Sequence, residues 1–197
     1  AVKKGVLVKE QIHHDRPAGM QGFAFNTRRE LFSDPQVRHA LAYAFNFEWS
    51  NKALFYGQYE RTRSYFQNSE MAATGLPGPD EMKLLEPFRA DLPPEVFTQE
   101  YNPPRGDESG NIRGNLRTAS KLLTEAGWVI KDGKRINAKT GKPFAFEMLL
   151  VSPLFERIAL PFAKNLEKLG IAMTVRTIDT AQYRRRLDTF DFDMVVG

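Results

Sequence analysis

Few side chains in this sequence have the type and spacing that chemistry requires. The one clustered run of metal-ligand type is His13-His14-Asp15, and adjacent residues of an extended segment point to opposite sides, so the two imidazoles cannot easily share one ion. Cysteine is absent, which excludes disulfides, thiolate nucleophiles and zinc–thiolate sites. The sequence also lacks G-x-S-x-G, G-x-G-x-x-G, phosphate-loop and H-E-x-x-H motifs. We therefore expect no catalytic residue, no metal and no cofactor.

Acids and aromatic residues leave two weaker possibilities. Asp188, Asp191 and Asp193 lie close together near the carboxyl end, and Asp193 could face a cleft. No histidine or metal motif accompanies them, so capping of helices and turns is the simpler interpretation. Aromatic residues make up 12% of the chain. Tyr65 and the aromatic run in residues 54–59 could line a ligand cleft, although aromatic side chains more often fill a core.

The charge of the chain permits, but does not identify, a polyanionic partner. The formal net charge of the 197 residues is +4, and such a balance is compatible with nucleic acid or an anionic membrane. The basic residues are spread along the chain, with the densest groups at residues 184–186 and 131–142. A solvated face is the simpler interpretation of both groups. No apolar run approaches the roughly 20 residues that a membrane helix needs.

The elements that would position a site begin with a strand and two helices. Residues 20–26 alternate large and small side chains, which indicates a strand. Ser33-Asp34-Pro35 is a typical helix start, and the apolar residues that follow it recur at i, i+3, i+4, i+7 and i+8. These residues are Val37, Ala40, Leu41, Ala44 and Phe45. Asn46 can start a second short helix, with Trp49, Ala53 and Leu54 inward and an end near Gly57.

A long irregular excursion follows, over residues 67–114. It holds seven of the twelve prolines and five glycines, and it predicts only one or two helical turns, near residues 81–88. So long a loop is unusual in a compact domain and is often functional. It could instead be held flat on the surface by four apolar side chains. These are Phe66, Leu76, Phe88 and Phe97.

Regular structure resumes at Asn115. A helix with an apolar stripe is predicted to end at Gly127, and Asp132-Gly133 indicates a hairpin turn. The expected elements after that are a strand at 144–151, a helix at 154–169 that Pro161 should kink or divide, a strand at 171–178, a helix at 180–187 and a buried strand at 192–197. This β-α-β-α-β order predicts an α/β lobe with parallel pairing. Because a buried strand ends at Gly197, we expect the natural protein to continue beyond it and to begin before Ala1.

Five blocks of the sequence resemble one known family in its own order. Residues 32–46, F-x-D-x-x-V-R-x-A-L-x-x-A-F-N, are similar to a helical segment of the extracellular solute-binding proteins of family 5, the oligopeptide and dipeptide binders of ABC importers. The other four blocks are FYGQY at 55–59, LLTEAGW at 122–128, LEKLGI at 166–171, and Tyr183, Leu187 and Phe192-Asp193-Met194. Residues 48–49, residues 59–66 and the proline-rich excursion are most similar to the branch that binds oligopeptides and peptide-like antibiotics.

The resemblance implies a fold, a function and partners. It implies one lobe, the carboxy-side one, of a type II periplasmic-binding-protein-like fold, with a mixed sheet flanked by helices and the excursion as an insertion in a single lobe spanning residues 1–197. It implies a periplasmic or membrane-tethered receptor that holds a peptide between two lobes, closes by hinge motion and delivers the peptide to the ABC permease subunits. The amino-side lobe would be the missing partner within the same protein. No nucleic acid is expected.

The positions that match ligand-contacting segments of the family are few. They are Ala24, Asn26, Tyr65, Leu187 and Val196, whereas the Gly-Trp and the acid that contact peptide in many relatives would lie past Gly197. Two other function classes stay open from the residues alone. A basic nucleic-acid-binding domain would show steeply salt-dependent affinity, and a peptide hydrolase would need a nucleophile or a metal that the motif search does not supply.

Overall fold

The computed structural model describes residues 2–10 and 12–197, and the inferred chain start around Ala1 lies outside them. The chain divides into two compact units. The first, which we call the loop unit, is Ala1–Met20 with Thr62–Asn102, and the second, the sheet unit, is Gln21–Arg61 with Pro103–Gly197. Each unit is described by itself. Among the described residues, no helix is long and apolar enough to cross a bilayer.

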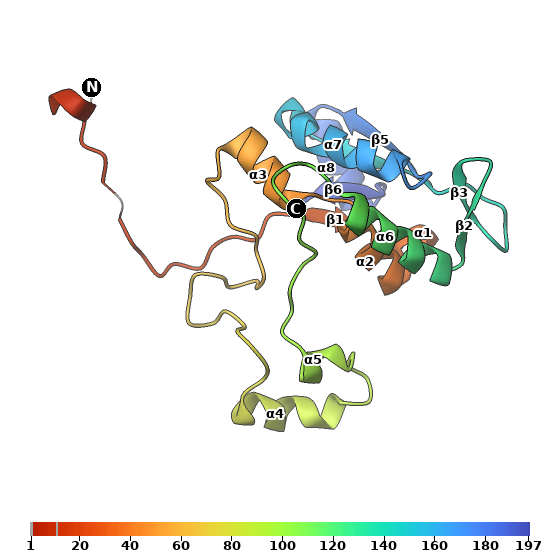
Figure 1. Cartoon of the computed structure of the whole chain (residues 1–197), viewed down its shortest axis with the longest axis horizontal. Helices are drawn as coiled ribbons and strands as arrows, with labels where there is room; N and C mark the ends of the chain where they lie inside the picture. The colour runs from red at the N-terminus through yellow and green to blue at the C-terminus, as the bar shows by residue number, and fades with distance from the viewer. Residues whose placement is uncertain (1, 11) are drawn as a thin grey trace. The chain divides into compact units, whose positions relative to one another are not determined.

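A mixed four-stranded sheet forms the centre of the sheet unit (Figure 1). The strands are β1 (Phe23–Phe25), β4 (Ala145–Leu150), β5 (Ala172–Thr177) and β6 (Met194–Val196), in the order β1-β6-β4-β5. β4 is parallel to both β5 and β6, and β1 is antiparallel to β6. The parallel pairing predicted from the β-α-β-α-β order is therefore confirmed.

Helices cover the sheet from both sides. The sheet unit contains α1 (Glu30–Ser33), α2 (Pro35–Ala42), α3 (Phe47–Phe55), α6 (Arg113–Glu125), α7 (Glu156–Glu167) and α8 (Thr180–Asp188). The main core lies on the face of the sheet that carries Phe146 and Met148, under α2, α6 and α7. Glu147 and Leu149 alternate to the opposite face, where α8 lies, because right-handed crossovers place α7 and α8 on opposite sides.

Local signals explain where the helices of the core begin. The Asp34 side chain accepts a hydrogen bond from the Gln36 amide, with Pro35 in the first helical position, and Asn46 caps α3 by accepting from the Trp49 amide. Both predicted helix starts are confirmed. The predicted inward position of Ala53 is wrong, because α3 buries Ser50 instead and leaves Ala53 exposed.

α7 shows how packing can override a local breaker. A single helix runs through Pro161, so of the two predicted outcomes, a kink or a division, the division does not occur. Proline removes one helical hydrogen bond, but the same helix buries Ala159, Phe162 and Leu166 against the sheet. Leu154, expected on the apolar stripe, is exposed in the short 3-10 turn Pro153–Phe155 that precedes the helix.

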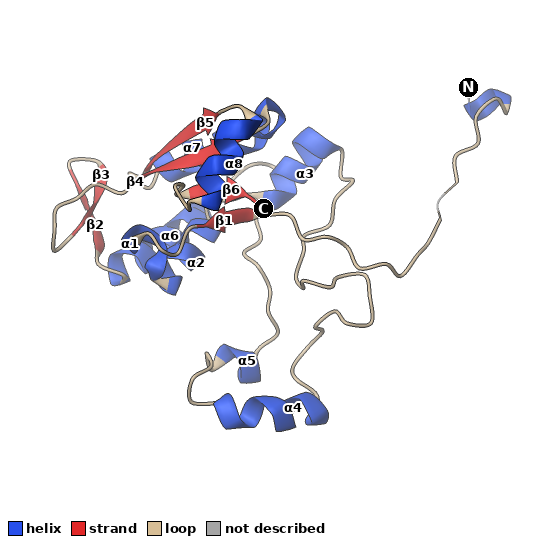
Figure 2. Cartoon of the chain, turned by 180° about the vertical axis from the view of Figure 1, so that it is seen from behind, coloured by secondary structure: helices blue, strands red, loops and turns tan. Residues whose placement is uncertain are grey.

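A two-stranded hairpin, β2 (Trp128–Lys131) with β3 (Lys134–Asn137), follows α6 (Figure 2). Its turn, Asp132-Gly133, has both φ angles positive, at 49° and 74°, as a type I′ turn requires. The predicted hairpin is confirmed. Under it, the Arg135 guanidinium is 1% exposed and donates to the carbonyls of Leu169 and Trp128 and to the Ser120 hydroxyl, at 3.0, 3.1 and 2.9 Å. Burial lowers the pKa of Arg135 from its ordinary value.

The loop unit is mostly irregular. Its helical segments are the 3-10 turn Val2–Lys4, α4 (Pro79–Leu85), the 3-10 turn Glu86–Phe88 and α5 (Glu95–Thr98). The helical turns predicted near residues 81–88 are confirmed, and α5 is an element that the sequence pattern did not predict. Three of the four expected apolar clamps, Phe66, Leu76 and Phe88, are about half exposed, at 46%, 51% and 58%.

Candidate ligand-binding site

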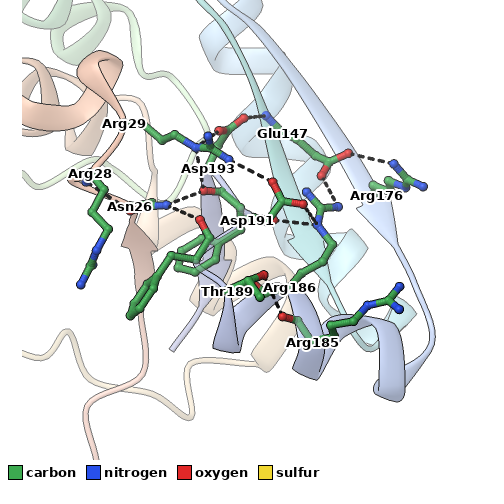
Figure 3. Close-up of polar contacts among 12 residues, drawn as sticks. Asn26, Arg28, Arg29, Glu147, Arg176, Arg185, Arg186, Thr189, Asp191 and Asp193 are labelled. Atoms are coloured by element: carbon green, nitrogen blue, oxygen red, sulfur yellow. Dashed lines mark hydrogen bonds and ion pairs between the residues drawn. The ribbon is translucent and has the colours of Figure 1, made fainter.

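The α8 side of the sheet carries a network of hydrogen bonds and ion pairs (Figure 3). It joins the end of β1, the middle of β4 and the loop between α8 and β6. This loop, residues 189–193, connects to residues more than 160 positions earlier in the chain, so only the tertiary fold brings the two segments together. We call this set of residues the α8 network. Its members are Asn26, Arg29, Glu147, Arg176, Arg186, Asp191 and Asp193.

Asn26 links β1 to the loop. Its side chain is 3% exposed and its amide nitrogen donates to the carbonyls of Phe190 and Phe192, at 2.9 and 2.8 Å. Its backbone N–H donates to the Asp193 carbonyl and its side-chain oxygen accepts from the Arg28 amide. Both amide hydrogens of the side chain are therefore used within the chain, which fixes the loop against the strand.

Asp193 links β6 to β4. Its Oδ2 accepts a hydrogen bond from the Glu147 backbone N–H at 2.9 Å. That amide precedes the first β4–β6 pair, Met148 with Met194, so β6 offers it no backbone partner. The carboxylate takes the place of the missing strand bond. Its other oxygen lies 3.3 Å from Nε of Arg29.

Three arginines balance three acids across this surface. Arg29 lies 3.2 Å from Asp191, Arg176 lies 3.6 Å from Glu147, and Arg186 lies 2.8 Å from Glu147 and 3.3 Å from Asp191. The Arg186 and Glu147 side chains are 20% and 22% exposed, whereas the other members of these pairs are more open. Since exposed ion pairs contribute little, the Arg186–Glu147 pair is the electrostatic centre of the network.

That central pair is imperfectly satisfied. Oε1 of Glu147 is buried and receives no hydrogen bond of acceptable geometry, although Nη1 of Arg186 is 2.8 Å away. The contact of Arg186 with this oxygen is therefore an ion pair without a hydrogen bond. A buried acceptor in this state costs free energy unless another donor reaches it.

An open hollow of about 550 Å³ adjoins the network. Four of its lining residues lie on one face of α8 and the turn after it, at a spacing of three, four and seven residues, and two come from β5 and the loop. They are Gln182, Arg185, Arg186, Thr189, Arg176 and Asp191. The lining is rich in N–H and O–H donors, so it suits a carbonyl-rich or anionic group. Among the described residues, no three His, Asp or Glu side chains are grouped to hold a metal ion.

The structure brings four of the five sequence-predicted ligand residues into the sheet unit. Ala24 is exposed at the middle of β1, opposite Val195, and Asn26 shares its strand face. Val196 packs its side chain on the main core, while its carbonyl lies 3.4 Å from the hydroxyl of Tyr183 on α8. Leu187 is half-buried on the same helix.

The fifth residue, Tyr65, belongs to the loop unit, where its side chain is 76% exposed. The hydroxyl of Tyr183, which the sequence analysis used only as a family match, loses solvent on α8, and this burial raises its pKa.

Sequence reasoning missed most of the α8 network. Glu147, Arg29 and Arg176 carry no local signal, because their partners are distant in the chain. The Arg184–Arg186 run was interpreted as a solvated face, which is wrong for Arg186 and its two acidic partners. The i, i+3, i+4, i+7 spacing of the four hollow-lining residues on α8 was the one signal that could have indicated a polar helix face.

The edge of the sheet beside this network is also unpaired in the strand order. β1 is the terminal strand, and Gly22 and Asn26 direct their backbone bonds to β6. Because bonded and non-bonded residues alternate in an antiparallel pair, the backbone N–H and C=O groups of Phe23 and Phe25 point away from β6. Such groups are able to pair with another extended chain.

Comparison with known proteins finds related sequences over almost the whole chain. The model of the bacterial extracellular solute-binding proteins, family 5, matches residues 2–197. The chain is 46% identical over 192 residues to YejA of Escherichia coli, and 44% identical over 198 residues to a probable peptide-binding protein, YejA, of Agrobacterium fabrum. These matches cover 98% and 100% of the chain but 32% of each relative, so the chain spans about a third of the length of the curated relatives it matches.

A solved structure shares the fold. The oligopeptide-binding protein AppA of Bacillus subtilis, in complex with a nonapeptide, superposes with a TM-score of 0.66 at 23% identity. The match covers 93% of this chain and 31% of AppA. At this identity the likeness is one of fold, and it agrees with a single lobe of a larger binding protein.

Proposed function

Because the chain belongs to family 5 of the bacterial extracellular solute-binding proteins, we propose that it is one lobe of the substrate-binding component of an ABC importer. In this proposal the whole protein is periplasmic or membrane-tethered, binds an oligopeptide or peptide-like compound in a cleft between two lobes, and delivers it to the permease subunits. The family is one of binding proteins, and we propose no catalytic step. The main support for this proposal is the match of the family model to residues 2–197.

Two features support a peptide as the ligand. A relative that is 44% identical over the full chain carries the name of a probable peptide-binding protein. The open edge of β1 offers backbone donors and acceptors at Phe23 and Phe25, and Ala24 between them is small and exposed, so an extended backbone could approach closely. Recognition through backbone groups would make few demands on the peptide's side chains.

Tyr65, Asn26, Leu187 and Val196 enter this proposal with different roles. Ala24 and Tyr65 are exposed and would contact the ligand directly. Asn26 would act by holding the loop at 189–193, since its amide hydrogens already have partners. Leu187 and Val196 would support the surface from α8 and β6.

The family match does not support the alternative of a nucleic-acid-binding domain. A nucleic-acid domain would bind DNA with an affinity that falls steeply with salt, whereas a peptide receptor should be largely insensitive. Measuring both ligands across a salt series on the same preparation separates the two classes.

Native mass spectrometry of the natural full-length protein, purified without added ligand, tests the proposal. We expect a co-purifying mass that dissociates intact and fragments as a peptide. A protein that is empty and also ignores a broad peptide library would remove peptides from the proposal and leave the family assignment alone.

A matched pair of substitutions tests the site. Ala24 and Ala172 are exposed alanines on opposite edge strands of the same sheet face. In the full-length protein, Ala24→Phe should weaken peptide binding about tenfold or more by filling the cleft, while Ala172→Phe should leave it unchanged. Equal affinities of the two variants by calorimetry would exclude the β1 edge from the site.

A further inference from the structure

The positive charge of this chain is concentrated in one short segment. Residues 131–142, which we call the lysine hairpin, contain five basic residues and one acid, Asp132. Subtracting them from the 28 basic and 24 acidic residues of the chain leaves 23 of each. The hairpin thus carries a formal charge of +4, equal to the net charge of the whole chain, and everything else is balanced. The excess positive charge of the chain is therefore located in the lysine hairpin.

The lysines of this segment are exposed and without acidic partners. They are Lys131, Lys134, Lys139 and Lys142. Within the described part of the chain, none of their Nζ atoms lies within 4.0 Å of a carboxylate oxygen. Among the other described lysines, Lys52, Lys83 and Lys121 have such a partner, at 2.6, 2.7 and 3.8 Å, whereas Lys164 and Lys168 do not.

The strand register adds a cost that the fold itself does not require. Lys131 and Lys134 are direct partners across the hairpin, on either side of Asp132-Gly133. Like charges directly opposite each other destabilise an antiparallel pair. An acid at either position would remove the repulsion and support the hairpin, so the pair is better explained by an anionic partner than by stability.

Contacts at its base anchor the hairpin to the rest of the sheet unit. The buried Arg135 guanidinium, the bond from its backbone N–H to the Gly170 carbonyl at 2.8 Å, and the packing of Trp128 on Phe144 fix its base. Figure 2 shows β2 and β3 extending from the sheet unit beyond the end of β4. Ile130 pairs with Arg135 and shares its strand face, so its side chain points away from the face that carries Lys131 and Lys134.

The spacing of the lysines identifies the kind of partner. One pair flanks the turn before β3, and the other, Lys139 with Lys142, flanks the turn after it, so the pairs are separated by a strand of roughly 10–13 Å. A single small anion cannot contact both. Lysine is a hydrated point charge that needs no planar, bidentate partner, and this suits many anions spread over a plane.

We propose that the lysine hairpin is a docking surface for the anionic headgroup layer of a lipid membrane. The choice of a membrane over other polyanions rests on the proposed function, because a receptor that delivers its ligand to a permease works at a bilayer surface. The hairpin orients the lobe by electrostatic attraction, and the attraction weakens as salt rises.

Vesicle co-sedimentation at low ionic strength tests this inference on the chain itself. Parent protein is mixed with phosphatidylcholine vesicles with and without 30% phosphatidylglycerol, a composition set by the experiment at roughly that of an anionic membrane. Lysine near such a surface contributes about fivefold each to binding, so Lys131→Gln, Lys134→Gln, Lys139→Gln and Lys142→Gln together should lower affinity by roughly a hundredfold or more. The parent should ignore pure phosphatidylcholine.

The matched control removes the same charge elsewhere. Replacing Lys52, Lys83, Lys121 and Lys164 with glutamine changes the net charge equally, and all four are exposed. This control should retain most of the parent's vesicle affinity. Equal loss in both variants would overturn the proposal, because net charge and not the hairpin would then govern binding. Failure of the parent to bind anionic vesicles would also overturn it.

Two further measurements distinguish membrane docking from general polyanion binding and from a failure of the proposed peptide-binding function. Affinity for a duplex DNA that equals the affinity for vesicles, with the same loss in the hairpin variant, would make the segment a general polyanion site and overturn the membrane assignment. In the full-length protein, the hairpin variant should still carry its peptide in native mass spectrometry. Loss of vesicle binding with peptide retained supports the inference, whereas an empty parent would count against the proposed function and not against docking.

Discussion

The sheet unit holds positive charge in two contrasting ways. Around α8, Arg29, Arg176 and Arg186 face Glu147, Asp191 and Asp193, and the most enclosed pair is about four-fifths buried. On the lysine hairpin, four lysines face solvent, and within the described residues none has a carboxylate oxygen within 4.0 Å of its Nζ. The paired network uses arginine, whose planar guanidinium can donate several hydrogen bonds. The hairpin surface uses lysine, a point charge on a flexible side chain.

The difference teaches that similar basic runs can serve opposite purposes. Residues 184–186 and 131–142 are both rich in basic residues, yet the first contributes Arg186 to a network in which three arginines balance three acids, and the second carries a charge equal to the net charge of the chain. Arg135 is the exception inside the hairpin, because it is buried and holds the base in place. Removing a buried or paired arginine should lower the free energy of unfolding, whereas replacing an unpaired hairpin lysine should leave it unchanged or raise it.

Arg135→Ala should have the largest effect. It leaves the carbonyls of Leu169 and Trp128 without their donor and opens a cavity under the hairpin, at a cost of about 3–5 kcal/mol of unfolding free energy. Urea denaturation measures it. The control Arg117→Ala, an exposed arginine on α6, should stay within about 0.5 kcal/mol of the parent. Equal midpoints for the two variants would show that the buried guanidinium is not the anchor.

Gly170→Ala should follow. Its φ is 76°, and a Cβ there would lie 2.7 Å from the Arg135 backbone nitrogen, so the hairpin base must shift. We expect a loss of about 2–4 kcal/mol. Gly114, in α6, has open space at its Cβ and no positive φ, so Gly114→Ala should be neutral or stabilising by up to about 1 kcal/mol. Thermal melting of the two variants gives the comparison, and a Gly170→Ala protein as stable as Gly114→Ala would refute the close approach.

Arg186→Ala tests the network around α8. Removing it leaves the buried Glu147 carboxylate with Arg176 at 3.6 Å as its remaining cation, and we expect a loss of about 1–2 kcal/mol. Arg184, two residues earlier on the same helix, makes an exposed pair with Asp188. Arg184→Ala should cost less than about 0.5 kcal/mol. Chemical denaturation that ranks the two variants in the opposite order would contradict the network assignment.

Lys131→Glu should have the smallest effect and the opposite sign. It replaces a like-charge cross-strand pair with Lys134 by an attractive one, and should stabilise the chain by about 0.2–1 kcal/mol. The double variant Lys131→Glu with Lys134→Glu restores repulsion and should lose that gain. If both variants have the parent's stability at low salt, the register carries no electrostatic cost, and that support for docking is removed.

Much of the fold could be predicted from sequence because its signals are local. Asp34-Pro35 and Asn46 set two helix starts, Asp132-Gly133 sets the hairpin, and the β-α-β-α-β order sets parallel pairing. The short helices α1 and α5 escaped prediction because four residues are too few to establish a 3.6-residue period.

The candidate site was less accessible to sequence analysis. Ala24 and Asn26 follow from the family resemblance, and whether they contact a ligand stays a prediction. Their surroundings could not be anticipated, since Asn26 reaches Phe190 and Phe192 across more than 160 residues. Strand alternation assigns Glu147 to one face of β4, but it says nothing about which helix covers that face.

By itself, the sequence determined the longer elements, the family and the location of the excess charge, because caps, turns, periodicity and residue counts are properties of neighbouring residues. Only the tertiary structure decided which charges are neutralised. Arg135 and Lys134 are adjacent and carry the same formal charge, yet Arg135 is 1% exposed and donates to α6, to β2 and to the turn after α7, while Lys134 faces solvent. The physical reason is that burial and pairing depend on what the fold places opposite a side chain, and those partners are distant along the chain.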